Sequence, residues 1–153
     1  MVYAKRTMVS SEKSRMEIER TLQRYGADAF GYAVTRDQAE IKFRWDGKVV
    51  RLRLRLPDSE AEEFQNTPTG LKRHGNAAHA EWEKACRQRW RVLALVIKAK
   101  LEGILAGITT FEEEFLAFLV LPDNRTVGEF ILPQIEAAYE LGDMPAMLTG
   151  GES

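Results

Sequence analysis

The chain has 153 residues, of which 44% are hydrophobic and 29% charged, and its formal net charge is −1. This length and composition predict a single soluble domain over residues 1–153, which buries roughly two-thirds of its unfolded surface. One cysteine and two histidines exclude a disulfide scaffold and the usual zinc modules. No apolar run reaches the roughly 18 residues of a membrane span, and residues 1–11 lack the apolar centre of a secretory signal. We therefore expect a cytoplasmic protein.

The first predicted element is a helix over residues 14–25. Ser14 and Glu17 have the spacing of a capping box, Ile18 and Leu22 recur at helical spacing, and Gly26 stands where a glycine often ends a helix. We expect residues 1–13 before this helix to be loose.

Three strands in meander order are predicted next, near residues 29–35, 39–45 and 48–56. The last two form a hairpin, because two alternating runs flank Asp46-Gly47, a dipeptide typical of a type I′ turn. Pairing outward from the turn sets three apolar pairs on one face: Phe43 with Val50, Ile41 with Leu52, and Ala39 with Leu54. This register also places Trp45 on the apolar face, which gives no support for base stacking.

The opposite face of the hairpin is basic and has one carboxylate, Glu40, opposite Arg53. Such a face could contact nucleic-acid phosphates. The candidate residues on this face are Lys42, Arg44, Arg51, Arg53 and Arg55. Pairing with acidic helices of the same or another chain, and simple solvation, are the alternatives.

Residues 57–76 contain two prolines, two glycines and several acidic residues, and predict a long loop. Asn76 can then cap a helix that runs without a breaker from residue 77 to about 106. Arg87 and Arg91 lie on a basic stripe of this helix and could add to the phosphate-binding surface, although a solvated helix face also explains them.

The C-terminal part is predicted to be helical and acidic. Thr110 opens a short helix by capping, and Thr126 opens the last helix, which ends near Gly142 and which Pro133 should kink or break around residue 132. We expect residues 144–153 to be loose. Helix-dipole stabilisation explains the carboxylates of the short helix, which are also candidate contacts with a protein partner: Glu112, Glu113 and Glu114.

Charge is divided unevenly along the chain. Residues 1–55 hold thirteen basic and seven acidic residues, whereas residues 108–153 hold one basic residue and nine acidic ones. The two segments therefore carry +6 and −8. This asymmetry fits a nucleic-acid surface at one end and an acidic partner surface at the other, but it also fits mutual attraction within one domain or between subunits.

Catalytic patterns are weak. His74 and His79 lack the spacing and the third ligand of a zinc site, and Cys86 falls on the apolar stripe of the long helix, so we expect neither a metal nor another cofactor. The sequence Glu40-Ile41-Lys42 has the pattern of one nuclease family, but the further carboxylates that metal-assisted hydrolysis requires do not converge on it. We expect a protein that is not an enzyme.

Residues 83–148 and 12–56 resemble a family of small, uncharacterised bacteriophage and prophage proteins. The clearest marks are Arg-Gln-Arg-Trp-Arg at 87–91, Thr-Phe-Glu-Glu-Glu-Phe at 110–115 and Pro-Gln-Ile-Glu at 133–136. The resemblance implies a phage gene product in the bacterial cytoplasm, with a role in DNA replication and recombination or in countering host defence. It implies no catalytic residue.

The predicted fold is α+β: an N-terminal helix, a three-stranded antiparallel meander, a long central helix and acidic C-terminal helices. The leading hypothesis for function is non-enzymatic nucleic-acid binding, which should weaken steeply with salt. The alternative is a protein-interaction module, such as an inhibitor of a host defence protein, that acts through its acidic helices and could form a homo-oligomer.

Overall fold

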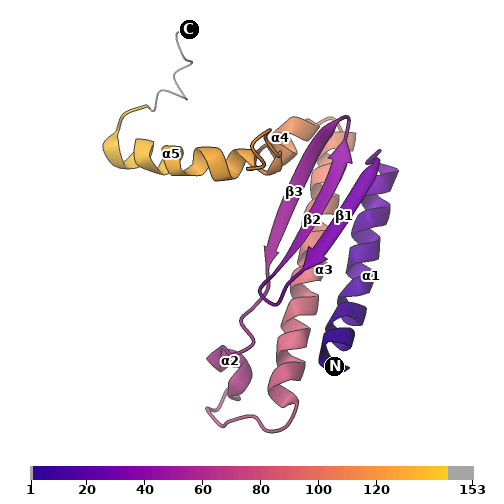
Figure 1. The fold of residues 1–153 in the computed structure, drawn as a ribbon, viewed down its shortest axis with the longest axis vertical. Helices are drawn as coiled ribbons and strands as arrows, with labels where there is room; N and C mark the ends of the chain where they lie inside the picture. Colours follow the sequence, from indigo (N-terminus) through magenta and orange to yellow (C-terminus); the bar gives the residue numbers. More distant parts are fainter. Residues whose placement is uncertain (1, 145–153) are drawn as a thin grey trace.

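A computed structural model describes residues 2–144 of the chain, with the side chains of residues 11–144. Residues 145–153, most of the tail that was predicted to be loose, lie outside the described residues. The fold is α+β, as predicted, with a three-stranded antiparallel sheet in the order β1-β2-β3 (Figure 1). Its elements are α1 (Val2–Arg24), β1 (Ala29–Val34), β2 (Gln38–Trp45), β3 (Lys48–Arg55), α2 (Glu62–Gln65), α3 (Ala77–Leu105), α4 (Phe111–Phe115), η1 (Leu116–Phe118) and α5 (Val127–Leu141).

The predicted hairpin register is confirmed. Phe43 pairs with Val50, and Glu40 pairs with Arg53. Asp46 and Gly47 have φ angles of 47° and 75°, as a two-residue type I′ turn requires. Every second side chain of β2 and β3 therefore points toward the helices, and the side chains between them form the outer face of the sheet.

The core lies between the inner face of the sheet and the helices α1 and α3, which both cover that face (Figure 1). Two aromatic residues of α4 close one end of the core, where Phe115 packs edge-on against Phe43 with ring centroids 5.5 Å apart. Cys86 is buried in α3, as predicted. The buried apolar residues of the cluster include Ile18, Leu22, Ile41, Val50, Trp90 and Ile97.

Helix α1 is longer than predicted. It begins at Val2, so residues 2–13 are helical rather than loose, and Ser14 and Glu17 lie inside the helix instead of capping it. No glycine or proline interrupts the chain before Gly26. The neighbouring α3 is 29 residues long and packs along α1.

The segment 57–76 is also more ordered than a plain loop. It forms the short helix α2, buries Phe64, and is tied to α3 by a hydrogen bond from the Trp82 indole Nε1 to the Pro57 carbonyl at 2.6 Å. The Arg73 guanidinium donates to the carbonyl oxygens of Glu63 and Phe64 at 2.9 and 3.1 Å. The loop prediction rested on prolines, glycines and acidic residues, and it did not include these side-chain contacts.

Helix ends are set largely as the sequence predicts. Capping boxes are present at Thr110 and Thr126, and Gly142 ends α5 with a φ of 71°. Asn76 precedes α3 but makes no side-chain capping hydrogen bond, because its backbone (φ −91°, ψ 8°) is outside the extended conformation of a cap. Of the kink or break expected near residue 132, the break is wrong, since α5 continues through Pro133. None of the described helices has the length and apolar character to cross a bilayer.

Candidate functional site

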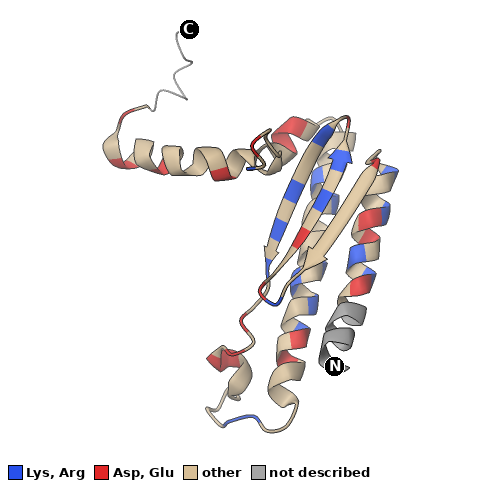
Figure 2. Cartoon of the chain, viewed as in Figure 1, with Lys and Arg blue, Asp and Glu red and all other residues tan. Residues whose placement is uncertain are grey.

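The outer face of the sheet bears the predicted phosphate-binding residues of β2 and β3 (Figure 2). It does not form a free cationic surface, however. The chain after η1 pairs with the edge of β3, where the Val120 amide donates to the Val49 carbonyl at 2.8 Å. This contact brings the turn at residues 121–124 and the start of α5 against the outer face.

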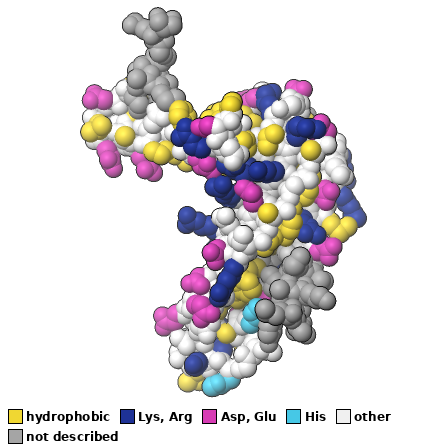
Figure 3. All heavy atoms as spheres, in the orientation of Figure 1, with side chains coloured by type: hydrophobic (Ala, Val, Ile, Leu, Met, Phe, Trp, Pro, Cys, Tyr) yellow, Lys and Arg dark blue, Asp and Glu magenta, His cyan; other side chains and the backbone are white. Residues whose placement is uncertain are grey.

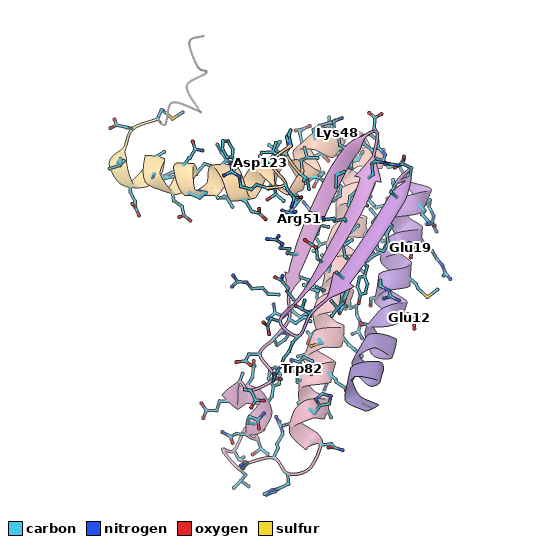
Figure 4. The ribbon with its side chains drawn as sticks, in the orientation of Figure 1. Glu12, Glu19, Lys48, Arg51, Trp82 and Asp123 are labelled. Atoms are coloured by element: carbon cyan, nitrogen blue, oxygen red, sulfur yellow. The ribbon has the colours of Figure 1, made fainter. Side chains whose placement is uncertain are left out.

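Arg51 is buried by this arrangement (Figure 4). Only 3% of its side chain is exposed, and its Nη2 donates to the Asn124 carbonyl at 2.9 Å and to both carboxylate oxygens of Glu129 at 3.3 Å. Its Nε lies 3.5 Å from a carboxylate oxygen of Glu40. Arg51 was predicted to contact phosphates, but in this structure it joins the sheet to the C-terminal helices and is closed to a ligand.

Two of the other four basic residues of this face, Arg44 and Arg53, are also paired. Arg53 bridges Glu129 at 3.0 Å and Glu40 at 3.5 Å. At the turn end of the hairpin, Arg44 pairs with Asp28 at 2.9 Å. Lys48, which lies opposite Trp45 and so belongs to the inner face, pairs with Glu112 at 3.0 Å. Intramolecular attraction, one of the alternatives considered above, therefore accounts for much of this basic face.

Two basic residues of the outer face remain available. Lys42 and Arg55 are exposed, and neither forms an ion pair with a described side chain. Arg53 is half-exposed despite its pairs. The residual cationic surface is thus smaller than the sequence pattern suggested.

Arg87 and Arg91 do not extend this surface. They lie on α3, which covers the inner face of the sheet, so the sheet separates them from Lys42 and Arg55. Arg87 also lies 4.0 Å from a carboxylate oxygen of Glu83. One nucleic-acid backbone running along the outer face would not reach both sets of residues.

The three predicted partner-binding carboxylates also have partners within the chain. Glu112 pairs with Lys48, and the Glu113 side chain accepts the Thr110 amide in the capping box at 3.1 Å. Glu114 accepts the Thr109 hydroxyl at 2.9 Å and lies 3.4 Å from Lys100 Nζ. These contacts tie α4 to β3 and to α3, although Glu112 and Glu113 remain exposed.

A projecting helix with exposed apolar residues was not identified from the sequence. Helix α5 packs on η1 at its N-terminal end, where Gly128 meets Ala117, and then projects away from the sheet (Figure 1). Leu132 is 55% exposed, Tyr139 87% and Leu141 75%. Hydrophobic side chains are visible along the projecting helix α5 in Figure 3.

We call residues 127–141 of α5 the arm. One side of the arm carries a narrow acidic stripe. Glu129, Glu136 and Glu140 recur at spacings of seven and four, so they share one side of the helix, and the segment has no basic residue. Apolar residues occupy most of the remaining circumference. This pattern was the available signal, because a surface helix ordinarily has a much wider polar side.

The described residues show little that resembles a catalytic centre. No group of three or more potential metal ligands gathers among them. Glu40, the carboxylate of the nuclease-like pattern, contacts Arg51 and Arg53. Burial raises the pKa of the Cys86 thiol to about 11, so the nucleophilic thiolate is not populated near neutral pH.

Several exposed carboxylates should make stability depend on pH. The Arg44 guanidinium lowers the pKa of Asp28. For Glu129, desolvation raises the pKa, but the hydrogen bond from the Thr126 amide and the charges of Arg53 and Arg51 outweigh it, so the pKa of Glu129 is lowered. A lowered folded-state pKa stabilises the fold above the ordinary values of 3.8 for Asp and 4.5 for Glu, and this contribution is lost as the pH falls through the lowered value. We expect the urea concentration at the unfolding midpoint to decrease as the pH is lowered below about 4.5. In Arg44→Gln this decrease with pH should be less steep. An unchanged slope in this variant would contradict the assignment.

Comparison with known proteins adds no relative: no family model, curated protein or solved structure matches the chain.

Proposed function

We propose that the protein is a non-enzymatic protein-interaction module, encoded by a phage and acting in the bacterial cytoplasm, that docks through α5. The exposed apolar surface of this helix supports the proposal, because contiguous apolar surface on a soluble protein commonly marks an interaction site. A helix that lies in an apolar groove is also a recurrent mode of protein recognition.

The charge of the arm indicates which residue types a partner's binding site should contain. Glu136 and Glu140 border the apolar surface, and neither forms an ion pair with a described side chain. A complementary site would therefore be apolar and bordered by Lys or Arg. Inhibition of a host defence protein with such a site is one role that fits this chemistry.

The test compares two surfaces of the same protein. The arm variant Leu132→Gln/Tyr139→Gln is matched with the sheet variant Lys42→Gln/Arg55→Gln, and each tagged protein is offered a co-expressed untagged copy together with nuclease-treated bacterial lysate. We expect wild type and the sheet variant to retain the same polypeptides and the arm variant to lose them. If the arm variant is folded by circular dichroism and retains every polypeptide that wild type retains, the proposal is wrong.

Nucleic-acid binding remains a second candidate, because Lys42 and Arg55 are exposed without ion pairs to described side chains and Arg53 is half-exposed beside them. With so few free cations we expect weak binding of DNA at low salt, detectable by fluorescence anisotropy. The logarithm of the affinity should fall with the logarithm of salt concentration, with a slope of about −2 to −3, since each phosphate contact contributes roughly −0.9.

The control for this second candidate is the variant pair already defined. Lys42→Gln/Arg55→Gln should abolish DNA binding, and Leu132→Gln/Tyr139→Gln should leave it unchanged. Binding that survives in the first variant, or that is absent in wild type at low salt, would eliminate the outer face as a nucleic-acid site.

A further inference from the structure

Helix α3 offers a second apolar surface, on the side that faces away from the core. Val92, Leu95 and Val96 are exposed there and lie close together at spacings of three, four and one. Beside them, α3 forms a groove of about 500 Å³ with the end of β3 and the segment of α2. The apolar residues of this groove include Leu54, Pro57, Phe64, Val92, Leu93 and Val96.

The charges around this surface are opposite to those of the arm. Residues 84–101 of α3 contain six basic residues and no acidic one, whereas residues 127–141 contain three acidic residues and no basic one. Arg89 and Glu63 line the groove, and Arg91 and Lys98 are exposed on the other side of the Val92, Leu95 and Val96 face. An apolar helix with an acidic stripe and an apolar face of α3 flanked by the basic residues Arg89, Arg91 and Lys98 are thus present on one chain.

The two surfaces do not meet within one molecule. The arm leaves the body beside Val49 and Val50, near the turn end of β3, whereas the groove includes Leu54 and Pro57 at the other end of that strand. From its attachment α5 projects outward, away from both long helices (Figure 1). Only another molecule can therefore bring an arm onto the outer side of α3.

We infer that this molecule is a second copy of the chain. The arm of each copy lies in the α3 groove of the other. This arrangement rests on the proposed function of α5 as a docking helix. Reciprocal exchange about a twofold axis buries both surfaces of both chains and closes the assembly, so no apolar arm remains to recruit further copies. Glu136 and Glu140 then face the basic residues of α3, while Glu129 keeps its pairs with Arg51 and Arg53 of its own chain.

Self-association of the purified protein tests the inference. We expect sedimentation and light scattering to give twice the chain mass of 17.4 kDa at concentrations up to about 100 μM. Leu95→Glu on α3, and separately Leu132→Gln/Tyr139→Gln on the arm, should each raise the dissociation constant at least about tenfold. Lys42→Gln/Arg55→Gln on the outer face of the sheet should not change it.

A charge exchange distinguishes this contact from any other dimer. Arg91→Glu/Lys98→Glu and Glu136→Lys/Glu140→Lys should each weaken the dimer, and the chain with all four substitutions should regain it, because the reversed charges again face each other. A wild-type protein that stays monomeric at the highest concentration overturns the inference, as does a dimer that none of these variants affects. In the monomeric case, loss of another polypeptide by the arm variant would leave the proposed function standing.

Discussion

Replacing Arg51 with alanine is expected to lower the free energy of unfolding by about 3 kcal/mol, because the substitution removes a buried guanidinium that joins the sheet to the C-terminal helices. The substitution removes the hydrogen bond that Arg51 donates to the Asn124 carbonyl at 2.9 Å. It also removes the positive charge that pairs with the carboxylates of Glu129 and Glu40. Urea denaturation at neutral pH, followed by circular dichroism, measures the loss.

Two further variants separate the causes of that loss. Arg51→Met keeps the aliphatic stem and fills much of the same volume, so stability close to wild type would show that the ion pairs contribute little beyond packing. Arg53→Ala is the matched control: the side chain shares Glu40 and Glu129 but is 49% exposed, so its loss should cost less than about 1 kcal/mol. An Arg51→Ala loss no larger than that of Arg53→Ala would contradict the structural role assigned to Arg51.

The contrast between these two arginines marks the limit of inference from the sequence. Their placement on the outer face follows from alternation and the Asp46-Gly47 turn, which act within a few residues. Glu40, one of their partners, follows from the same register, but their other partners, Asn124 and Glu129, come from more than seventy positions later in the chain, and alternation carries no information about such distant contacts. Net charge did indicate that the acidic C-terminal segment competes for the basic face.

Local signals explain the other successes and failures as well. The capping boxes at Thr110 and Thr126 were predictable, because each is completed within three residues. The same motif was misassigned at Ser14, where packing of α1 along α3 extends the helix past it. The pattern of the arm indicates a mostly apolar helix, but the same pattern fits a helix that packs within its own chain and one that packs on another.

The attachment of the arm to the body leads to a second large effect, at Gly128. A Cβ atom at this position would lie 2.9 Å from the Ala117 carbonyl oxygen and 3.4 Å from the Ala117 Cβ. The first contact is with backbone, which cannot move aside as a side-chain tip would. We expect Gly128→Ala to cost about 1 to 3 kcal/mol by overpacking and to displace α5 from η1, despite the higher helix propensity of alanine.

Gly103→Ala provides the control, because it makes the same substitution inside α3. Its Cβ would lie 3.2 Å from the Thr109 hydroxyl and 3.6 Å from the Glu114 carboxylate, both of which are side-chain atoms that can shift. The gain in helix propensity of up to about 1 kcal/mol should leave this variant at or above wild-type stability. Urea midpoints and amide exchange across residues 119–141 report the two effects. If Gly128→Ala keeps both wild-type values, close packing of α5 on η1 does not fix the direction of the arm, and the position of α5 must depend on Arg51 and Glu129 instead.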